Sequence, residues 1–161
     1  MIAGMTPSVF FHVLLSLVGI LSGFIVVFGL LANKPMVAMT HVFLATTILT
    51  SVTGFFLPAA HFMPSHALGI LSLIALMVAV VAWYSKNLAG GWRRAYAISA
   101  VIALYFNFFV LIAQSFMKVP ALHALAPTGT EGPFKIAQLV ALVIFLLLSI
   151  AAARNFRAND N

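Results

Sequence analysis

Residues 96–138 read YAISAVIALYFNFFVLIAQSFMKVPALHALAPTGTEGPFKIAQ, and this stretch decides the fold. Its first half is apolar and long enough to cross a bilayer as a helix, and its second half is the longest polar loop of the chain. At about 100° per residue, one side of that helix collects five residues that are polar or small: Tyr96, Ala103, Asn107, Gln114 and Lys118. Because buried amides and a cation are costly in lipid, the sequence predicts that this side faces other protein segments.

The composition excludes a soluble globular domain. Of the 161 residues, 64% are hydrophobic and 6% are charged, whereas about a quarter of the residues in a typical soluble domain are charged. We therefore predict an all-α integral membrane protein whose surroundings are the lipid bilayer. The net charge of +6 does not indicate nucleic-acid binding, because the lysines and arginines occur singly or in pairs beside apolar segments.

Apolar runs separated by turn signals predict one domain, a bundle of five transmembrane helices. The predicted spans are residues 9–31, 36–58, 67–84, 95–117 and 134–153, with a loop over residues 118–133. Six cations flank the spans on one side, against Lys118 and Lys135 on the other: Lys34, Lys86, Arg93, Arg94, Arg154 and Arg157. The positive-inside rule then predicts an outer N-terminus, a cytoplasmic C-terminus and an outer loop at 118–133.

Two spans carry rows of small or hydroxyl residues. Gly19 and Gly23 in the first span form a GxxxG pair, which lets another helix approach closely. That pair indicates a packing seam, and a homo-oligomer or larger membrane complex formed through this face is the alternative. The second span has five such residues on one side, either as a polar lining or as hydroxyls bonded back to their own helix: Thr40, Thr47, Ser51, Gly54 and Pro58.

Most of the polar chemistry belongs to the outer half of the predicted bundle. His12, Gln114 and Gln138 each lie about one turn inside their spans from that side, so they should share a depth. We expect them to converge, either as a hydrogen-bonded packing network or around a ligand. The candidate ligand-binding residues are His12, Asn107, Gln114, Lys118, His123, Glu131 and Gln138.

Three kinds of cofactor remain open. The spacing of His61, Met63 and His66 combines imidazole and thioether groups, which suit copper. A haem near the outer surface could be ligated by His12 and a loop histidine. A quinone-like molecule would need an imidazole or amide donor beside aromatic side chains, which His12 and Gln114 could supply.

The sequence favours a non-enzymatic membrane module that binds a small ligand or a partner protein near its periplasmic face. A channel or transporter for a small solute or metal ion is one alternative, but the polar side of the fourth span becomes poor inward of Asn107. A membrane-embedded enzyme is the other, and it would depend on a histidine and Glu131 at the outer face. No catalytic residue is assigned, since the sequence has no G-x-S-x-G, H-E-x-x-H, P-loop or paired-carboxylate pattern.

Three segments carry a resemblance: FLATTILTSVTGFFLP (43–58), ALYFNFFVLIAQSFMKVPALHALAPT (103–128) and PFKIAQ (133–138). They are similar to segments of a group of small, uncharacterised bacterial membrane proteins. The resemblance covers most of the chain from the first span to the last. It implies a bacterial inner-membrane setting and carries no mechanism.

Overall fold

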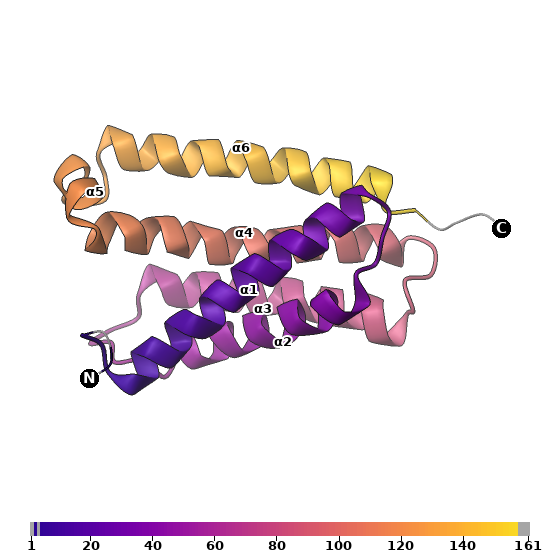
Figure 1. The fold of residues 1–161 in the computed structure, drawn as a ribbon, viewed down its shortest axis with the longest axis horizontal. Coiled ribbons are helices and arrows are strands. Elements are labelled where there is room, and N and C mark those ends of the chain that lie inside the picture. The colour runs from indigo at the N-terminus through magenta and orange to yellow at the C-terminus, as the bar shows by residue number, and fades with distance from the viewer. Residues whose placement is uncertain (1, 3, 158–161) are drawn as a thin grey trace.

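The computed structural model describes residues 2 and 4–157, and most of these residues are helical. Five of its helices are long and apolar enough to cross a membrane, which confirms the predicted all-α architecture of five spans (Figure 1). They are α1 (Pro7–Leu31), α2 (Val37–Gly54), α3 (Pro64–Val80) continued by the π-helical turn η1 (Val81–Ser85), α4 (Trp92–Lys118) and α6 (Gly132–Asn155). A short helix, α5 (Pro120–Leu125), connects α4 to α6.

Proline sets several helix boundaries. The first turns of four helices contain one, namely Pro7, Pro64, Pro120 and Pro133, because a proline there loses no intrahelical hydrogen bond. The third span therefore begins at Pro64, earlier than the predicted residue 67. The second span ends at Gly54 and not at the predicted residue 58, because the ring of Pro58 disfavours helical backbone at the residue before it.

Four of the spanning helices form a ring, and the fifth lies outside it. Helix α1 packs on α2, α2 on α3, α3 on α4, and α4 returns to α1. Helix α6 packs along α4 and touches α1 (Figure 1). The interior of the ring is therefore bordered by α1 to α4 and not by α6.

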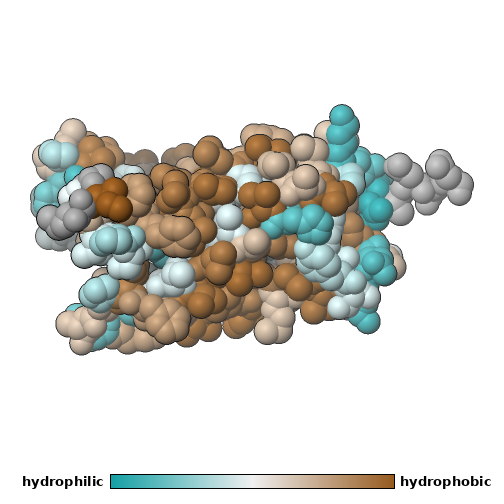
Figure 2. All heavy atoms as spheres, turned by 60° about the horizontal axis from the view of Figure 1, so that its bottom comes forward, coloured by the Kyte–Doolittle hydropathy of each residue, from teal (hydrophilic) through white to brown (hydrophobic). Residues whose placement is uncertain are grey.

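The two ends of the bundle differ in charge. We call the end with residues 32–36 and 86–91 the basic end, because it carries the six cations named above, and the end with residues 55–63 and 119–131 the loop end. A broad apolar belt separates polar groups at the two ends (Figure 2). At the basic end, Arg93 donates to the carbonyl oxygen of Arg157 over 3.0 Å and Asn155 donates to that of Leu31 over 3.1 Å. These bonds tie the end of α6 to α4 and α1.

The half of the ring next to the basic end is densely packed. Its largest fully buried side chains include Val26, Leu30, Phe43, Tyr96, Val101, Leu104 and Phe156. The hydroxyl of Tyr96 is hydrogen-bonded to that of Thr40 over 3.1 Å, so this buried phenol has a partner. This half of the protein is a closed hydrophobic core.

The GxxxG pair packs inside the chain. A Cβ added at Gly23 would lie 2.7 Å from the Leu104 side chain and 3.0 Å from the Phe43 ring. Gly19 faces the side chains of Thr47 and Asn107 in the same way. Both glycines are buried between α1, α2 and α4, so the pair forms a packing seam within the chain.

A larger residue at Gly23 should loosen this crossing. Phe43 and Leu104 are fully buried and cannot move aside, so Gly23→Leu should lower the free energy of unfolding by about 3 kcal/mol or more. Thermal or denaturant unfolding in detergent would measure the change. Gly91→Leu is the matched control, because a Cβ at Gly91 meets nothing within 4 Å, and equal stability of the two variants would contradict the packing described here.

Candidate functional site

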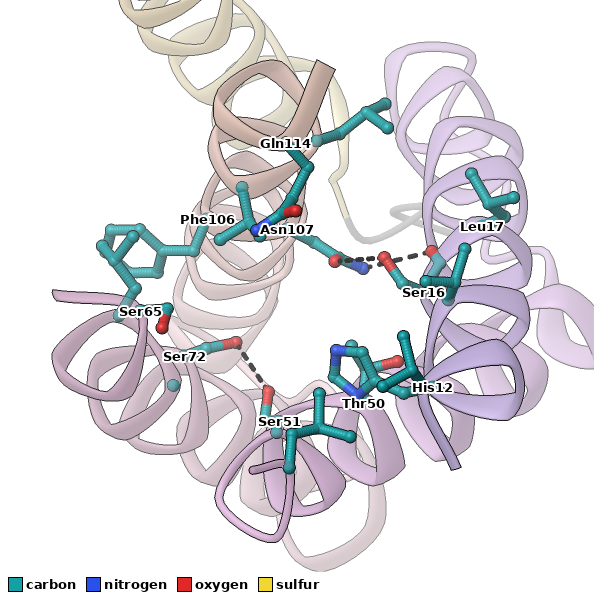
Figure 3. Close-up of a pocket in the computed structure, with 18 of the residues that line it drawn as sticks. His12, Ser16, Leu17, Thr50, Ser51, Ser65, Ser72, Phe106, Asn107 and Gln114 are labelled. Carbon is teal, nitrogen blue, oxygen red and sulfur yellow. Dashed lines mark hydrogen bonds between the residues drawn. The ribbon is translucent and has the colours of Figure 1, made fainter. Parts of the chain in front are cut away.

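A cavity of about 570 Å³ occupies the loop-end half of the ring. Each of the four ring helices contributes to its wall, and Figure 3 shows side chains from all four directed toward a common space. Apolar side chains such as Val13, Leu68, Val110 and Leu111 make up much of the lining. The cavity is thus a mainly apolar chamber between helices, with polar groups at defined places.

The floor of the cavity is a hydrogen-bonded contact between α1 and α4. Ser16 donates its hydroxyl to Asn107 Oδ1 over 3.0 Å, and Asn107 Nδ2 donates to the carbonyl oxygen of Ser16 over 3.4 Å (Figure 3). Gly19 lies one turn further along α1, and the absence of a side chain there gives Asn107 its space. The side chain of Thr47 in α2 also lies against Gly19. Its buried hydroxyl has no hydrogen-bond partner among the described residues.

His12 projects from α1 into the chamber (Figure 3). Its Nδ1 lies 2.9 Å from the hydroxyl of Thr53, and that hydroxyl donates its only hydrogen to the carbonyl oxygen of Leu49 over 2.7 Å. The Thr53 oxygen is therefore able to accept from His12 in the tautomer whose hydrogen is on Nδ1. In the neutral ring this leaves Nε2 as an acceptor.

Small residues and one aromatic stack close the wall between α2 and α3. Ser51 donates to Ser72 over 3.3 Å and joins the two helices. The ring of Phe55 packs on Gly69, where an added Cβ would lie 3.3 Å away, and it stacks on His66 with 5.5 Å between centroids. His66 Nδ1 accepts the backbone N–H of Met63 over 2.9 Å, so this histidine caps the start of α3.

Gln114 and Lys118 line the α4 side of the chamber nearer the loop end. They lie one turn apart on the same helix face, and both are exposed. Neither side chain has a hydrogen bond or an ion pair with another residue in the part of the chain that the structure describes. The mouth of the cavity therefore presents an amide and a cation that are free to interact with a bound molecule.

The predicted convergence holds for four residues: His12, Asn107, Gln114 and Lys118 all line the cavity. His123, Glu131 and Gln138 do not. Gln138 donates to the carbonyl oxygen of Phe109 over 3.2 Å, and it lies between α6 and α4 because α6 is outside the ring. Gln138 therefore does not join His12 and Gln114, and its Oε1 atom is buried without a partner among the described residues.

The other two residues belong to the loop end. His123 is exposed on α5. The carboxylate of Glu131 accepts from the hydroxyl and backbone N–H of Thr128 over 2.7 and 3.1 Å and from the N–H of Thr130 over 3.0 Å. The hydroxyl bond from Thr128 is the main reason why the pKa of Glu131 falls to about 2. Glu131 thus holds the turn before α6 and does not reach the cavity.

The predicted copper ligands are not arranged around one point. His61 is exposed in the connection before α3, and His66 has already used Nδ1 on the Met63 backbone. Within residues 2 and 4–157, no group of three or more His, Cys, Asp or Glu side chains could hold a metal ion. The structure therefore offers no support for the copper hypothesis.

Sequence reasoning identified some of the lining and missed the rest. Four of the five residues predicted to share one side of the second span line the cavity: Thr47, Ser51, Gly54 and Pro58. The fifth, Thr40, does not, and its hydroxyl donates to the carbonyl oxygen of Pro35. The contact of His12 with Thr53 was missed, because these residues lie on different helices and no local pattern links them.

Comparison of the chain with known protein families, curated proteins and solved structures finds no match.

The floor contact can be tested by a double-mutant cycle on Ser16 and Asn107. Ser16→Ala and Asn107→Leu should each destabilise the protein, and together they should show a coupling of about 0.5–2 kcal/mol, because each single change leaves the other partner unsatisfied. Unfolding free energies in the same detergent would provide the four values. Strictly additive effects would show that the two side chains do not interact.

Proposed function

We propose that this protein is a multi-pass module of the bacterial inner membrane that binds one small, largely apolar organic molecule in its loop-end cavity and does not convert it chemically. The observation that carries the proposal is a chamber that lies inside the membrane-crossing part of the bundle and ends on a hydrogen-bonded floor. Its volume of about 570 Å³ falls within the range of about 300–1,000 Å³ that is usual for small-molecule sites. Apolar walls with a few polar groups are also typical of such sites.

The polar groups suit a ligand that is bound and oriented. His12 offers an acceptor at Nε2, and Gln114 offers both a donor and an acceptor. These groups lie near the loop end, whereas deeper in the chamber Ser16 is bonded to Asn107 and Ser51 to Ser72. A molecule with a polar head and an apolar body would therefore place its head toward the loop end.

The packing beneath the floor favours binding over transport. Inward of Asn107, α4 presents Ala103, Ala100 and Tyr96, all of them fully buried. A channel or transporter needs a polar path through both halves of the bilayer, and a core of this kind does not provide one. The remaining alternative, an enzyme using a histidine with Glu131, lacks support because the Glu131 oxygens are bound within their own turn.

The charge distribution supports a periplasmic mouth. Six cations lie at the basic end, and only Lys118 and Lys135 lie near the loop end. By the positive-inside rule, the basic end would face the cytoplasm and the N-terminus would be outside. The cavity would then lie in the outer half of the membrane.

Filling the chamber should abolish ligand retention. Val110→Trp places a large ring on the α4 wall of the cavity, so we expect this variant to lose an organic molecule that the purified wild-type protein retains at one per chain. Native mass spectrometry, followed by solvent extraction, would measure retention.

The matched control is Ile144→Trp, which adds the same ring on α6 at a side chain that is 49% exposed and outside the cavity. This variant should retain the molecule. The proposal fails if the two variants retain it equally, or if the wild-type protein retains none.

A further inference from the structure

We infer that the ligand of this cavity is a single-chain amphiphile with an anionic head group, whose apolar chain fills the chamber and whose head pairs with Lys118 at the mouth. The inference rests on the proposed function and specifies the chemical class of the ligand. Three features of the cavity carry it: an uncompensated cation, the depth of the chamber, and the gap between α1 and α4.

The first feature is the charge of Lys118. Among the described residues Glu131 is the only acidic one, and its carboxylate is bound by Thr128 and Thr130. Lys118 therefore has no carboxylate partner in the described part of the chain. Its side chain lines the cavity. A cation beside an apolar chamber attracts an anion more strongly than one in bulk water, because the local dielectric constant is lower.

Gln114 adds a second donor for the same head group. It lies one turn inward of Lys118 on the same face of α4, so both side chains can reach one acceptor group. Its amide has no partner among the described residues. An ammonium and an amide side by side suit a carboxylate or a phosphate, and they would leave the rest of the chamber to an apolar chain.

The second feature is the depth of the chamber. From Lys118 to Asn107, α4 advances by roughly 16 Å at 1.5 Å per residue. One leaflet is half of a hydrocarbon core of about 30 Å, or about 15 Å. The chamber is therefore about as deep as the acyl region of a single leaflet. At its floor Ser16 and Asn107 are bonded to each other, and Thr47 is the described residue there whose hydroxyl has no partner. The end of an apolar chain would therefore displace no hydrogen bond between these groups.

The third feature is lateral access. Helices α1 and α4 contact each other from the Ser16 and Asn107 pair inward, where Phe24 also packs edge-on against Phe108. Toward the loop end the first turns of α1 lie away from α4 (Figure 1). On this side Leu17 is 41% exposed although it also lines the cavity. An amphiphile dissolved in the surrounding leaflet could enter between these two helices.

Binding of three probes with the same chain would test the inference: tritiated dodecanoate, dodecyl phosphate and dodecanol, measured on wild-type protein in phosphatidylcholine nanodiscs with empty nanodiscs as background. At least one of the two anions should bind saturably and about tenfold more tightly than the alcohol, a difference of about 1.4 kcal/mol. The tighter anion identifies the head group as a carboxylate or a phosphate.

Variants of two lysines locate the charge that is responsible. Lys118→Gln should weaken binding of the anion about five- to tenfold and leave dodecanol binding unchanged, and Lys118→Arg should keep most of the affinity. Lys135→Gln is the matched control, because this cation belongs to the first turns of α6, near the loop end, and does not line the cavity. Its effect on binding should be small.

Two results would overturn the inference and leave the proposed function standing: dodecanol binding as tightly as both anions, or equal effects of Lys118→Gln and Lys135→Gln. Saturable binding of none of the three probes would overturn the inference too. The proposed function itself is decided separately, by the retention of a molecule in wild-type protein and its loss in Val110→Trp.

Discussion

The contact between Ser16 and Asn107 is the interaction on which the rest of the structure depends. It joins α1 to α4, the first and last helices of the ring, and so closes the ring beneath the cavity. An amide in the apolar interior of a membrane protein is unfavourable without partners, and Asn107 has both a hydroxyl and a carbonyl of α1. The approach is close enough for this only because residue 19 is a glycine, around which side chains of α2 and α4 meet. The same contact forms the floor of the chamber.

The two halves of the bundle follow from this arrangement. Toward the basic end, the helices are held together by large buried side chains and by the bonds of Arg93 and Asn155 at the end of α6. Toward the loop end, α1 leans away from α4, and small residues line the wall between α2 and α3, so a space remains. Helix α6 supports α4 from outside the ring through Gln138 and leaves the space undivided. A chamber in one half of the bundle and a solid core in the other half suit a protein that holds a molecule better than one that lets it pass.

The sequence predicted the helical spans because hydropathy and proline positions are local properties. It also predicted correctly that Asn107 faces protein, since the helical period fixes the direction of a side chain relative to its own axis. The sequence did not predict which helix would pack against that side of α4. Gln138 contacts Phe109 and not Gln114, because α6 packs on the outer side of α4, and this order of helices is set by contacts between distant residues. The prediction that Glu131 belongs to the site was wrong for a related reason. Its carboxylate accepts a hydrogen bond from Thr128, three residues away in the same turn, and such local bonds keep the side chain from contacting more distant residues.

The most direct test of a chamber closed at the middle of the membrane is cysteine accessibility, for which the chain is well suited because it contains no cysteine. Single cysteines would replace Val110 and Gln114 in the chamber and Ala100 and Ala103 below the floor, and each variant would be treated with a small membrane-impermeant maleimide from either side of the membrane. The account predicts reaction at positions 110 and 114 from the periplasmic side only, and none at positions 100 and 103 from either side. Reaction at position 100 or 103 would reveal a continuous aqueous path and contradict the closed floor, and reaction at 110 and 114 from the cytoplasmic side would contradict the orientation.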